Sequence, residues 1–472
     1  MNKNVSMKPL TSLQSWVSCK ILPDNNEGPI TPDAIYCPGR VGHVAVCIRD
    51  ELFVWGGYYQ NEQWGTVYCK KAEVWVYSLD RDRWSRYFPR GAGSRHSSGS
   101  CSTMVWPYWY VLCGYLARGY TNIIWRLNML TCTFESVRPQ GDAISPRDKT
   151  VAWALDSRIF VLGGYGSVPL MCHIWDAEED IYVREPMIEE DRGWLDQLAA
   201  FDTLTQTWAL VETRGVSPLP RAAHSAVRVD MAVYIFGGRL AGVRMSDLHR
   251  LDLQSFTWSG ALACNGDGPE GRSWHTMTRI NEKNVILMGG YSDSNEILDD
   301  LWMLNVESLT WSLLQQHTQM PRLWHTACTN SMGDLLIFGG CTNNILDIAS
   351  PMESSGDVLT VRLEPYSLER LSMHVLWKSR PGSWASWRSL PRNFRNWLEQ
   401  REKAGWEMNR MIYRCQAYSM YGPSLTQLSV LQPGQADLIN KSIVDIVELE
   451  LEKQKDSQDK STVDDSGIPY VQ

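Results

Sequence analysis

Two arginines of this chain are placed where they could bind an anion. Arg239 and Arg244 lie five residues apart in the short loop RLAGVR. A guanidinium carries planar pairs of N–H donors that match the two oxygens of a carboxylate. Two guanidiniums on one loop therefore predict a receptor for a carboxylate or another small anion. The alternative is that both arginines form salt bridges with neighbouring parts of the fold.

The sequence contains no recognisable catalytic or metal-binding motif. It lacks a P-loop, a G-x-S-x-G pattern and an H-E-x-x-H pattern. The 12 cysteines are scattered without a C-x-x-C pair, which argues against a zinc cluster and a compact disulfide framework. We therefore expect a non-catalytic protein with no metal and no cofactor, whose cysteines are mostly buried, reduced thiols.

Composition narrows the possible partners. The 472 residues are 44% hydrophobic, which allows a large core, and 45 basic residues against 53 acidic ones give a net charge of −8. Such a chain has no overall basic surface, which argues against nucleic acid and membranes as partners. The N-terminus has no apolar signal region, and no run approaches the roughly 20 apolar residues of a membrane span. We expect a protein of the cytoplasm and nucleus.

An internal repeat reveals the elements that must position the arginine loop. A short apolar run that ends in Gly-Gly, once in Cys-Gly, occurs six times, as LFVWGGY, YVLCGY, IFVLGGY, VYIFGGR, VILMGGY and LLIFGGC. The last glycines of these runs are 57, 50, 74, 52 and 50 residues apart. An R-x-x-H segment precedes several runs, so its histidines belong to the repeat rather than to a metal site. An aromatic residue ends the later strand pattern in most copies, namely Trp84, Phe134, Trp208, Trp258 and Trp311.

This pattern resembles kelch repeats and covers residues 36–365. The resemblance implies an all-β fold, a six-bladed kelch β-propeller whose four-stranded blades pack face to face around an axis. Glycine suits the doublets because the chain turns sharply at the crowded inner end of each blade. The sixth copy lacks the terminal tryptophan, so Trp16 in the N-terminal segment 1–35 could supply an outer strand that closes the ring. A small α-helical segment is expected after the propeller.

In such a propeller the residue after each doublet and the R-x-x-H segment lie at one end, around the axis. Arg239 follows its doublet where four other copies have tyrosine. Trp274 and Trp324 could wall a pocket at this end or belong to the core. The 74-residue spacing reflects an acidic insertion that could overhang the same end or form a solvated loop. The recurring arginines are expected to bond loop carbonyls between blades: Arg40, Arg95, Arg147, Arg221, Arg272 and Arg322.

The segments FGGRLAGVRMSDLHRLDL, GRSWHTMT, PRLWHTACTN, SPRDK and RGW carry a narrower resemblance. They resemble the kelch domain-containing protein 1 and 2 group, whose members are substrate receptors of cullin-2 RING ubiquitin ligases. Members of that group bind a client's extreme C-terminus and favour a terminal glycine or Gly-Gly. The resemblance implies that Arg239, Arg244 and Ser273 hold the terminal carboxylate. It also implies a pocket lined by Lys149, Tyr58, Tyr165, Trp194 and Trp274.

Two short motifs follow the propeller, within residues 366–400. SLERLSMHVL resembles an elongin-binding box, with Leu368, Ser372 and Leu376 at its marked positions. LPRNFRNWL resembles a cullin box, marked by Leu390, Pro391, Phe394 and Leu398. The resemblance implies elongin B/C and cullin-2 with its RING subunit as partners, besides client proteins. Residues 401–472 are expected to hold one helix and a disordered polar tail.

Two other functions are compatible with a propeller of this kind. Short apolar helical patterns often mean only that a helix packs on its own domain. The chain would then be a kelch scaffold or adaptor that binds a folded partner. A small-molecule hydrolase would need acidic and metal-binding residues at the axis, where this sequence is expected to place basic and aromatic ones.

Overall fold

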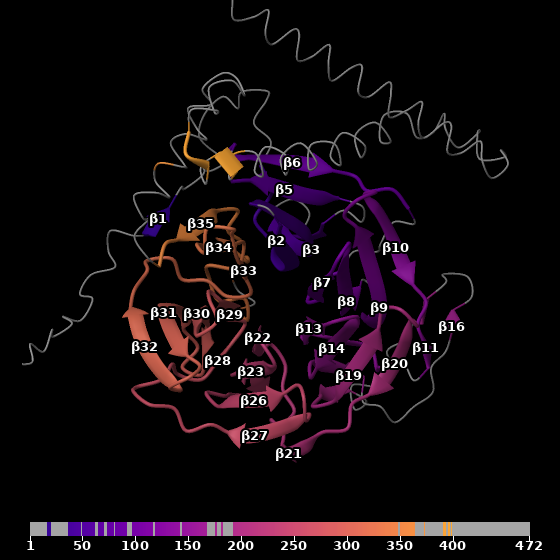
Figure 1. Ribbon diagram of the computed structural model, residues 1–472, viewed down its shortest axis with the longest axis vertical. Helices are drawn as coiled ribbons and strands as arrows, with labels where there is room; N and C mark the ends of the chain where they lie inside the picture. Colours follow the sequence, from indigo (N-terminus) through magenta and orange to yellow (C-terminus); the bar gives the residue numbers. More distant parts are fainter. Residues whose placement is uncertain are drawn as a thin grey trace, which may run out of the picture.

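The computed structural model describes residues 17–19 and most of 36–363, together with 372, 390–392, 395, 396 and 398. The gaps within 36–363 are residues 49, 62–64, 70–72, 80, 92–96, 117–118, 142–143, 168–174, 177–180, 183–191 and 348–349. Every regular element described up to Leu363 is a β-strand. The described strands form six sheets of four or five strands, besides three smaller ones. The six sheets are arranged as blades around an axis, as predicted (Figure 1).

Each blade is an antiparallel meander that starts at the axis and ends at the rim. Blade 1 contains β2 (Val41–Ile48), β3 (Glu51–Asn61), β5 (Val74–Ser78) and β6 (Arg83–Tyr87), with β4 (Gly65–Tyr68) paired to β3. Blade 2 contains β7 (Cys101–Val105), β8 (Tyr108–Leu116), β9 (Gly119–Asn128) and β10 (Thr133–Val137). Blade 3 contains β13 (Val151–Leu155), β14 (Arg158–Leu162), β19 (Leu198–Asp202) and β20 (Thr207–Leu210).

The second half of the ring repeats this order. Blade 4 contains β22 (Ser225–Val229), β23 (Ala232–Phe236), β26 (Leu248–Asp252) and β27 (Thr257–Ala261). Blade 5 contains β29 (Thr276–Arg279), β30 (Asn284–Ser292), β31 (Ile297–Asn305) and β32 (Thr310–Gln315). Blade 6 contains β33 (Thr326–Thr329), β34 (Leu335–Phe338), β35 (Val358–Val361) and, outermost, β1 (Val17–Cys19).

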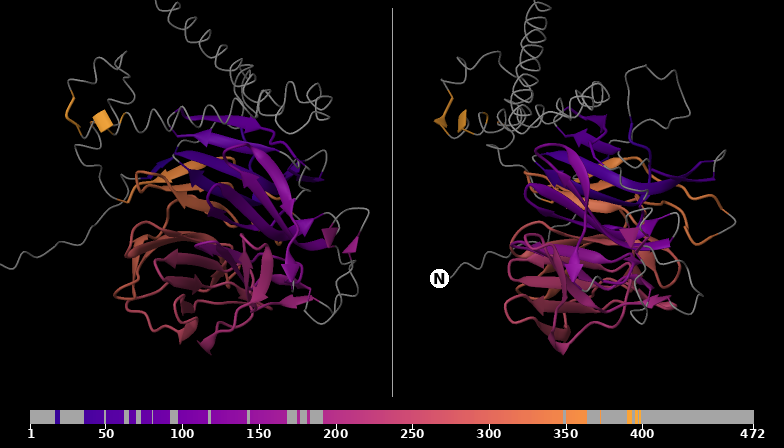
Figure 2. Two further views of the ribbon diagram at one scale, coloured as in Figure 1. Left: turned by 45° about the vertical axis from the view of Figure 1, so that its right-hand side comes forward. Right: turned by 90° about the vertical axis from the view of Figure 1, so that its right-hand side faces the viewer.

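The ring is closed by a strand from the beginning of the chain. β1 pairs antiparallel with β35, so the sixth blade combines both ends of the propeller sequence. Trp16, which the sequence placed in such a strand, lies outside the described residues. Blade 6 then packs beside blade 1, and the two lie side by side in Figures 1 and 2. The Asp50 carboxylate joins them by accepting hydrogen bonds from the backbone N–H of Ser331 at 2.8 Å and from its hydroxyl at 2.7 Å.

The hydrophobic core lies between consecutive blades. One cluster joins blades 1 and 2 through fully buried side chains such as Trp55 and Trp109. The aromatic residues predicted to end each strand pattern are buried on the outer strands: Trp84, Phe134, Trp208, Trp258 and Trp311. Each sheet therefore buries both faces, as a closed ring of blades requires.

The outer edge of several blades is covered by the linker from the preceding blade. β21 (Arg214–Val216) runs parallel to β27, and β11 (Gln140–Gly141) runs parallel to β20. Gly215 has a φ of +76°, and a Cβ there would lie 2.2 Å from the carbonyl oxygen of Trp258. Only glycine fits so close to a neighbouring backbone, and the linker thereby occupies an edge that would otherwise be free to pair.

The cysteines are mostly as expected. Among the cysteines whose side chains are described, eight are free, and five of these are buried. Cys132 is the exception, because it is disulfide-bonded to a partner outside that set. The expectation of reduced thiols is therefore wrong for Cys132.

The recurring arginines hold the inner end of each blade together. In the five described copies the Nη1 group donates to the carbonyl of the first doublet glycine at 2.9–3.2 Å. Each Nε donates to a carbonyl two residues earlier. These arginines are Arg40, Arg147, Arg221, Arg272 and Arg322. The side chains thus bond carbonyls of the loops that join the blades, as expected, as well as the doublet of their own blade, and the backbone carbonyls of Arg40, Arg221, Arg272 and Arg322 accept an N–H from the preceding blade.

Blade 2 departs from this scheme. Arg95, predicted to be its recurring arginine, lies outside the described residues. The position equivalent to the arginine is instead Ser97, because the next residue, Ser98, exchanges backbone hydrogen bonds with Tyr115 as Ala222 does with Arg239. The Ser97 hydroxyl reaches the Cys113 carbonyl at 3.5 Å. The second copy of the repeat is therefore aligned two residues later than predicted, with Ser97 instead of Arg95 at the arginine position.

The repeated histidines lock neighbouring blades. A Cβ added at the first doublet glycine would lie within 3.1 Å of the imidazole of the next blade, as for Gly163 and His224. Burial lowers the pKa of His43, His224 and His325 to about 3, and the buried His275 shifts in the same direction. The folded protein therefore holds all four imidazoles neutral.

This burial predicts a loss of stability in mild acid. Unfolded histidines gain a proton near pH 6.5, whereas the folded ones do so only near pH 3. The contribution of these neutral histidines to the free energy of unfolding is complete above pH 6.5 and is lost as the pH falls toward 3. We expect the free energy of unfolding to fall by about 1 kcal/mol for each buried histidine between pH 7 and 5.5. Urea denaturation at the two pH values measures this.

The control for this experiment is the exposed His317. His224→Gln should reduce the pH dependence, whereas His317→Gln should leave it almost unchanged. An unchanged slope in His224→Gln would contradict a role for buried histidines.

Candidate functional site

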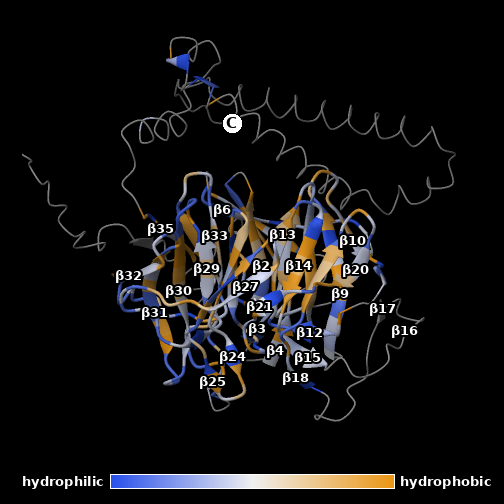
Figure 3. Cartoon of the chain, turned by 60° about the horizontal axis from the view of Figure 1, so that its bottom comes forward, coloured by the Kyte–Doolittle hydropathy of each residue, from blue (hydrophilic) through white to orange (hydrophobic). Residues whose placement is uncertain are grey.

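The arginine loop lies at one end of the propeller. β24 (Arg239–Leu240) and β25 (Val243–Arg244) form a two-stranded hairpin in which Arg239 and Arg244 are directly paired. β15 (Tyr165–Ser167) and β18 (Arg192–Trp194) form the corresponding hairpin of blade 3. Figure 3 shows both hairpins, with β4, at the same end of the molecule. The residues after the doublets occupy equivalent positions there: Tyr58, Tyr115, Tyr165, Arg239, Tyr291 and Cys341.

A ring of backbone hydrogen bonds surrounds the axis at this end. Six equivalent residues, one from each blade, form this ring. In five described cases the N–H of one residue donates to the carbonyl of the equivalent residue in the preceding blade, at 2.8–2.9 Å. All six residues have a positive φ. They are Gly42, Gly99, Lys149, Ala223, Trp274 and Trp324. We call them the axial residues, since their backbones converge on the axis.

Two tryptophans fill the centre of this ring. The Trp274 and Trp324 rings are stacked with centroids 5.6 Å apart, and Tyr58 contacts Trp324 edge-on at 6.0 Å. A Cβ on Gly42 or Gly99 would lie 3.2 or 3.4 Å from the Trp324 ring. Both tryptophans are half-buried. They therefore form a partly exposed aromatic floor at the axis, which also packs against a buried cluster that includes Tyr291, Leu323 and Cys341.

Arg244 is anchored beside this floor. Its Nε donates to the Ser273 hydroxyl at 3.2 Å, and its guanidinium carbon lies 4.4 Å from the centre of the Tyr291 ring. The nearest acid is Asp293, whose carboxylate is 4.0 Å from Nη1 and accepts from the Arg244 backbone N–H. Arg239 donates from Nε to the carbonyl of Ala241 at 2.5 Å. The geometry thus brings Arg239, Arg244 and Ser273 together.

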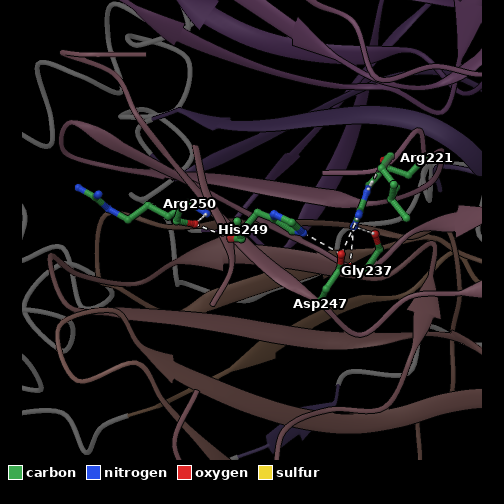
Figure 4. Close-up of polar contacts among 8 residues, drawn as sticks. Arg221, Gly237, Asp247, His249 and Arg250 are labelled. Atoms are coloured by element: carbon green, nitrogen blue, oxygen red, sulfur yellow. Dashed lines mark hydrogen bonds and ion pairs between the residues drawn. The ribbon is translucent and has the colours of Figure 1, made fainter. Parts of the chain in front are cut away.

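The electrostatics of this pair differ from those of the structural arginines. Arg221 is held by both oxygens of Asp247 at 2.7 and 2.8 Å (Figure 4). Arg272 is held in the same way by Asp300. Among the described residues no acid pairs with Arg239, and the salt bridge considered for Arg244 is only the 4.0 Å contact.

Burial, and then the charge of Arg239, lower the pKa of Arg244. Two adjacent guanidiniums with so little compensating charge are chemically suited to an anion.

The other residues of the predicted pocket surround the axis. Lys149 lies over the Trp324 ring at 5.4 Å but is also ion-paired with the buried Asp148. Tyr165 and Trp194 are paired across β15 and β18, and their rings meet edge-to-face at 4.9 Å. Asp148 was missed by sequence reasoning, although it stands beside Lys149 in SPRDK. The Asp148 carboxylate balances the charge of Lys149, so the less compensated positive charge at this end of the propeller is that of Arg239 and Arg244.

Sequence reasoning also missed Tyr120 and Arg192. Tyr120 contacts both Tyr115 and Tyr165, and the Arg192 guanidinium lies 5.5 Å from the centre of its ring. Arg192 directly precedes the Gly-Trp of RGW, which was the one available signal. Of the acidic insertion, residues 171–197, the structure describes β16 (Trp175–Asp176) and β17 (Ile181–Tyr182), which pair antiparallel, and residues 192–197, which include β18.

The residues of the two C-terminal motifs are only partly described. Ser372 and Leu398 have helical backbones, and Leu398 is 1% exposed. The Arg395 N–H donates to the Pro391 carbonyl at 3.1 Å, as in a helix that starts after Leu390. Leu368, Leu376 and Phe394 lie outside the described residues.

No group of three or more metal-ligating side chains occurs in the described part of the chain. Within the same residues, no helix is long and apolar enough to cross a membrane.

The fold defines a β-propeller protein built from six repeated blades. The family model KLHDC2/KLHL20/DRC7 Kelch-repeats domain matches residues 28–185 and 188–340. The chain therefore belongs to the kelch-repeat family. It is 36% identical over 350 residues to kelch domain-containing protein 1 of Homo sapiens, covering 72% of this chain and 84% of that protein. It is 33% identical over 375 residues to kelch domain-containing protein 2 of Bos taurus, covering 77% and 91%.

The pairing of Arg239 with Arg244 predicts that Arg239 lowers the free energy of unfolding. Like charges placed directly opposite on two strands repel each other, so Arg239→Gln should raise the free energy of unfolding by about 0.5 kcal/mol. The gain should shrink in high salt because salt screens the repulsion. Urea denaturation at low and high salt measures both effects.

Arg250 provides the control for this change. It is also partly exposed, but it pairs with Asp252 at 3.3 Å. Arg250→Gln should bring no gain, and an equal gain in both variants would argue against repulsion.

Proposed function

We propose that this protein recognises the C-terminal carboxylate of client proteins at the Arg239 and Arg244 pair. The observation that carries the proposal is a pair of adjacent guanidiniums for which the described residues offer only one acidic contact, that of Asp293 at 4.0 Å from Arg244. A chain terminus differs from every internal peptide bond by its full negative charge. Bidentate arginine contacts are suited to that difference, and Ser273 offers a further hydrogen-bonding group beside Arg244.

The aromatic floor supports a preference for a small terminal residue. Trp274 and Trp324 are stacked at the axis, and Tyr58 and Lys149 contact Trp324. A carboxylate on the arginines would place its own Cα beside these rings. A terminal glycine or Gly-Gly would fit best, because each larger side chain needs space that the rings occupy.

The client-binding end would serve a ubiquitin ligase. In this proposal the protein is a non-catalytic substrate-recognition subunit of a cullin-2 RING ligase in the cytoplasm and nucleus, docked through elongin B/C. The resemblance of the motifs at 367–376 and 390–398 supports it.

Carboxylate recognition predicts a simple binding result. A peptide that ends in Gly-Gly as the free acid should bind, and the same peptide amidated should not. Arg239→Ala should weaken binding of the free acid by about 2–4 kcal/mol, because it removes one partner of a partly desolvated charge. Fluorescence polarisation with the full chain measures both.

A surface control separates a local effect from a general one. Arg250→Ala removes a paired arginine on the outer part of blade 4 and should leave affinity unchanged. Equal losses in the two variants, or equal binding of acid and amide, would contradict the proposal. No binding of either peptide would favour the adaptor function.

Ligase assembly predicts co-purification. Elongin B and C, co-expressed with this chain, should be retained on it, and Leu368→Ala should release them without affecting peptide binding. Leu346→Ala, a change at an exposed leucine within the propeller, is the control. Retention of elongin by the Leu368→Ala variant would contradict the assignment of the elongin-binding box.

A further inference from the structure

We propose that Cys47 and Cys328 form a redox-modification site, at which a peroxide joins the two thiols in a reversible disulfide between blades 1 and 6. The two residues lie on β2 and β33, the innermost strands of these blades. Blade 6 is also the blade that β1 completes from the beginning of the chain. The disulfide would therefore add a covalent link where the ring closes. This inference does not depend on the proposed function.

The Cys47 side chain points from β2 toward blade 6. Side chains alternate between the two faces of a strand. On the face that turns to blade 6, His43 bonds Thr326, and Ala45 packs against the cluster that holds Phe338. Cys47 is the next residue on the same face.

The Cys328 side chain points from β33 toward blade 1. It stands two residues after Thr326, on the same face, and packs against the same cluster as Ala45. The two strands are close, since Cα atoms of β2 and β33 approach within 8 Å. A side-chain hydrogen bond with Cys328, and then burial, raise the pKa of Cys47. The two thiols are therefore in contact across the interface between the blades.

The two strands are fixed on both sides of the thiol pair. Before the pair, His43 Nε2 lies 2.9 Å from the Thr326 hydroxyl. Three residues after each cysteine, the Asp50 carboxylate accepts the two hydrogen bonds from Ser331, at 2.8 and 2.7 Å. A disulfide demands a narrow range of backbone separation. These bonds hold the backbones close together, so that the thiols can be joined with little movement.

Access to solvent distinguishes this pair from other neighbouring thiols. The side chains of Cys47 and Cys328 are both half-buried. The Cys101 thiol bonds Cys113 in a similar way, but these two side chains are only 7% and 1% exposed. An oxidant must reach the sulfur before it can react. Of these two thiol pairs, the one between blades 1 and 6 is the pair that a peroxide can reach.

The thiol pair also lies away from the arginine hairpin. β2 begins at the arginine end of the propeller, where Val41 pairs with Tyr58. Cys47 lies near the other end of β2, where it pairs with Leu52. The proposed site is therefore separate from the candidate binding site.

The reaction needs one molecule of peroxide as the oxidant. One thiolate takes an oxygen atom from hydrogen peroxide, whose O–O bond breaks, and the first product is a sulfenic acid with one water. The second thiol then attacks that sulfur. The S–S bond forms, the S–OH bond breaks and a second water leaves. The two sulfurs lose two electrons in total, which the peroxide gains, and a dithiol reductant reverses the change.

Peptide mapping of the full chain tests the site. The chain is treated with hydrogen peroxide, its remaining thiols are alkylated, and it is digested with trypsin without a reductant. Cys47 is released in fragment 41–49 and Cys328 in fragment 323–362. We expect a species that joins the two fragments, with two hydrogen atoms fewer than their sum. Dithiothreitol should separate it.

Two variants assign the bond to its sulfurs. Fragment 323–362 also contains Cys341, so Cys341→Ser should keep the joined species and Cys328→Ser should abolish it. Cys264→Ser is the matched control, because Cys264 is also half-buried but its thiol bonds Trp311. The joined species should persist in this control.

Thermal unfolding provides a second measurement. Peroxide treatment should raise the melting temperature of the chain by about 5 °C, because the link constrains a long loop of the unfolded chain. The rise should be absent in Cys328→Ser and Cys47→Ala and present in Cys264→Ser. Melts of the untreated variants show whether each one folds.

Three results would overturn the proposal. The first is that both fragments remain separate, either alkylated or oxidised to sulfinic acid, after prolonged peroxide treatment. The second is a joined species that survives in Cys328→Ser, which would assign the bond to Cys341. The third is an equal rise of the melting temperature in Cys328→Ser, which would show that the stabilising oxidation occurs elsewhere.

Discussion

The inner end of each blade depends on hydrogen bonds that satisfy backbone carbonyls crowded around the axis. An arginine spans two segments of its own blade in five blades, and serine takes its place in the second. The axial residues then join backbone to backbone across the blades. Buried carbonyls without partners would be costly, so these bonds fix six loops in one arrangement. Every residue of the candidate site stands on one of those loops.

Since the backbone carries this arrangement, the side chains at the same positions are free to differ. The axial residues include two glycines, an alanine, a lysine and two tryptophans, and each keeps the same left-handed backbone. Arginine illustrates the division most clearly. Arg221 and Arg272 have bidentate aspartate partners and stabilise the fold, whereas Arg239 and Arg244 are paired across a hairpin where the only acidic contact among the described residues is that of Asp293, 4.0 Å from Arg244. The same residue type thus serves structure in one place and binding in another.

The closure of the ring depends on both ends of the propeller sequence. β1 completes the blade that the last propeller strands begin, so the chain leaves the propeller after blade 6 with its ring complete.

The sequence by itself determined the number of blades, their strands and the prominence of Arg239. Each of those features depends on residues that are close together in the sequence, and the six copies of the repeat make the pattern recognisable. Only the tertiary structure decided the place of Ser97, the pairing of Lys149 with Asp148, the Trp274 and Trp324 stack, and the contact of Tyr120 with Arg192. Two of these contacts, the tryptophan stack and the contact of Tyr120 with Arg192, join residues of different blades. Their partners are chosen by the closure of the ring, which no local spacing encodes.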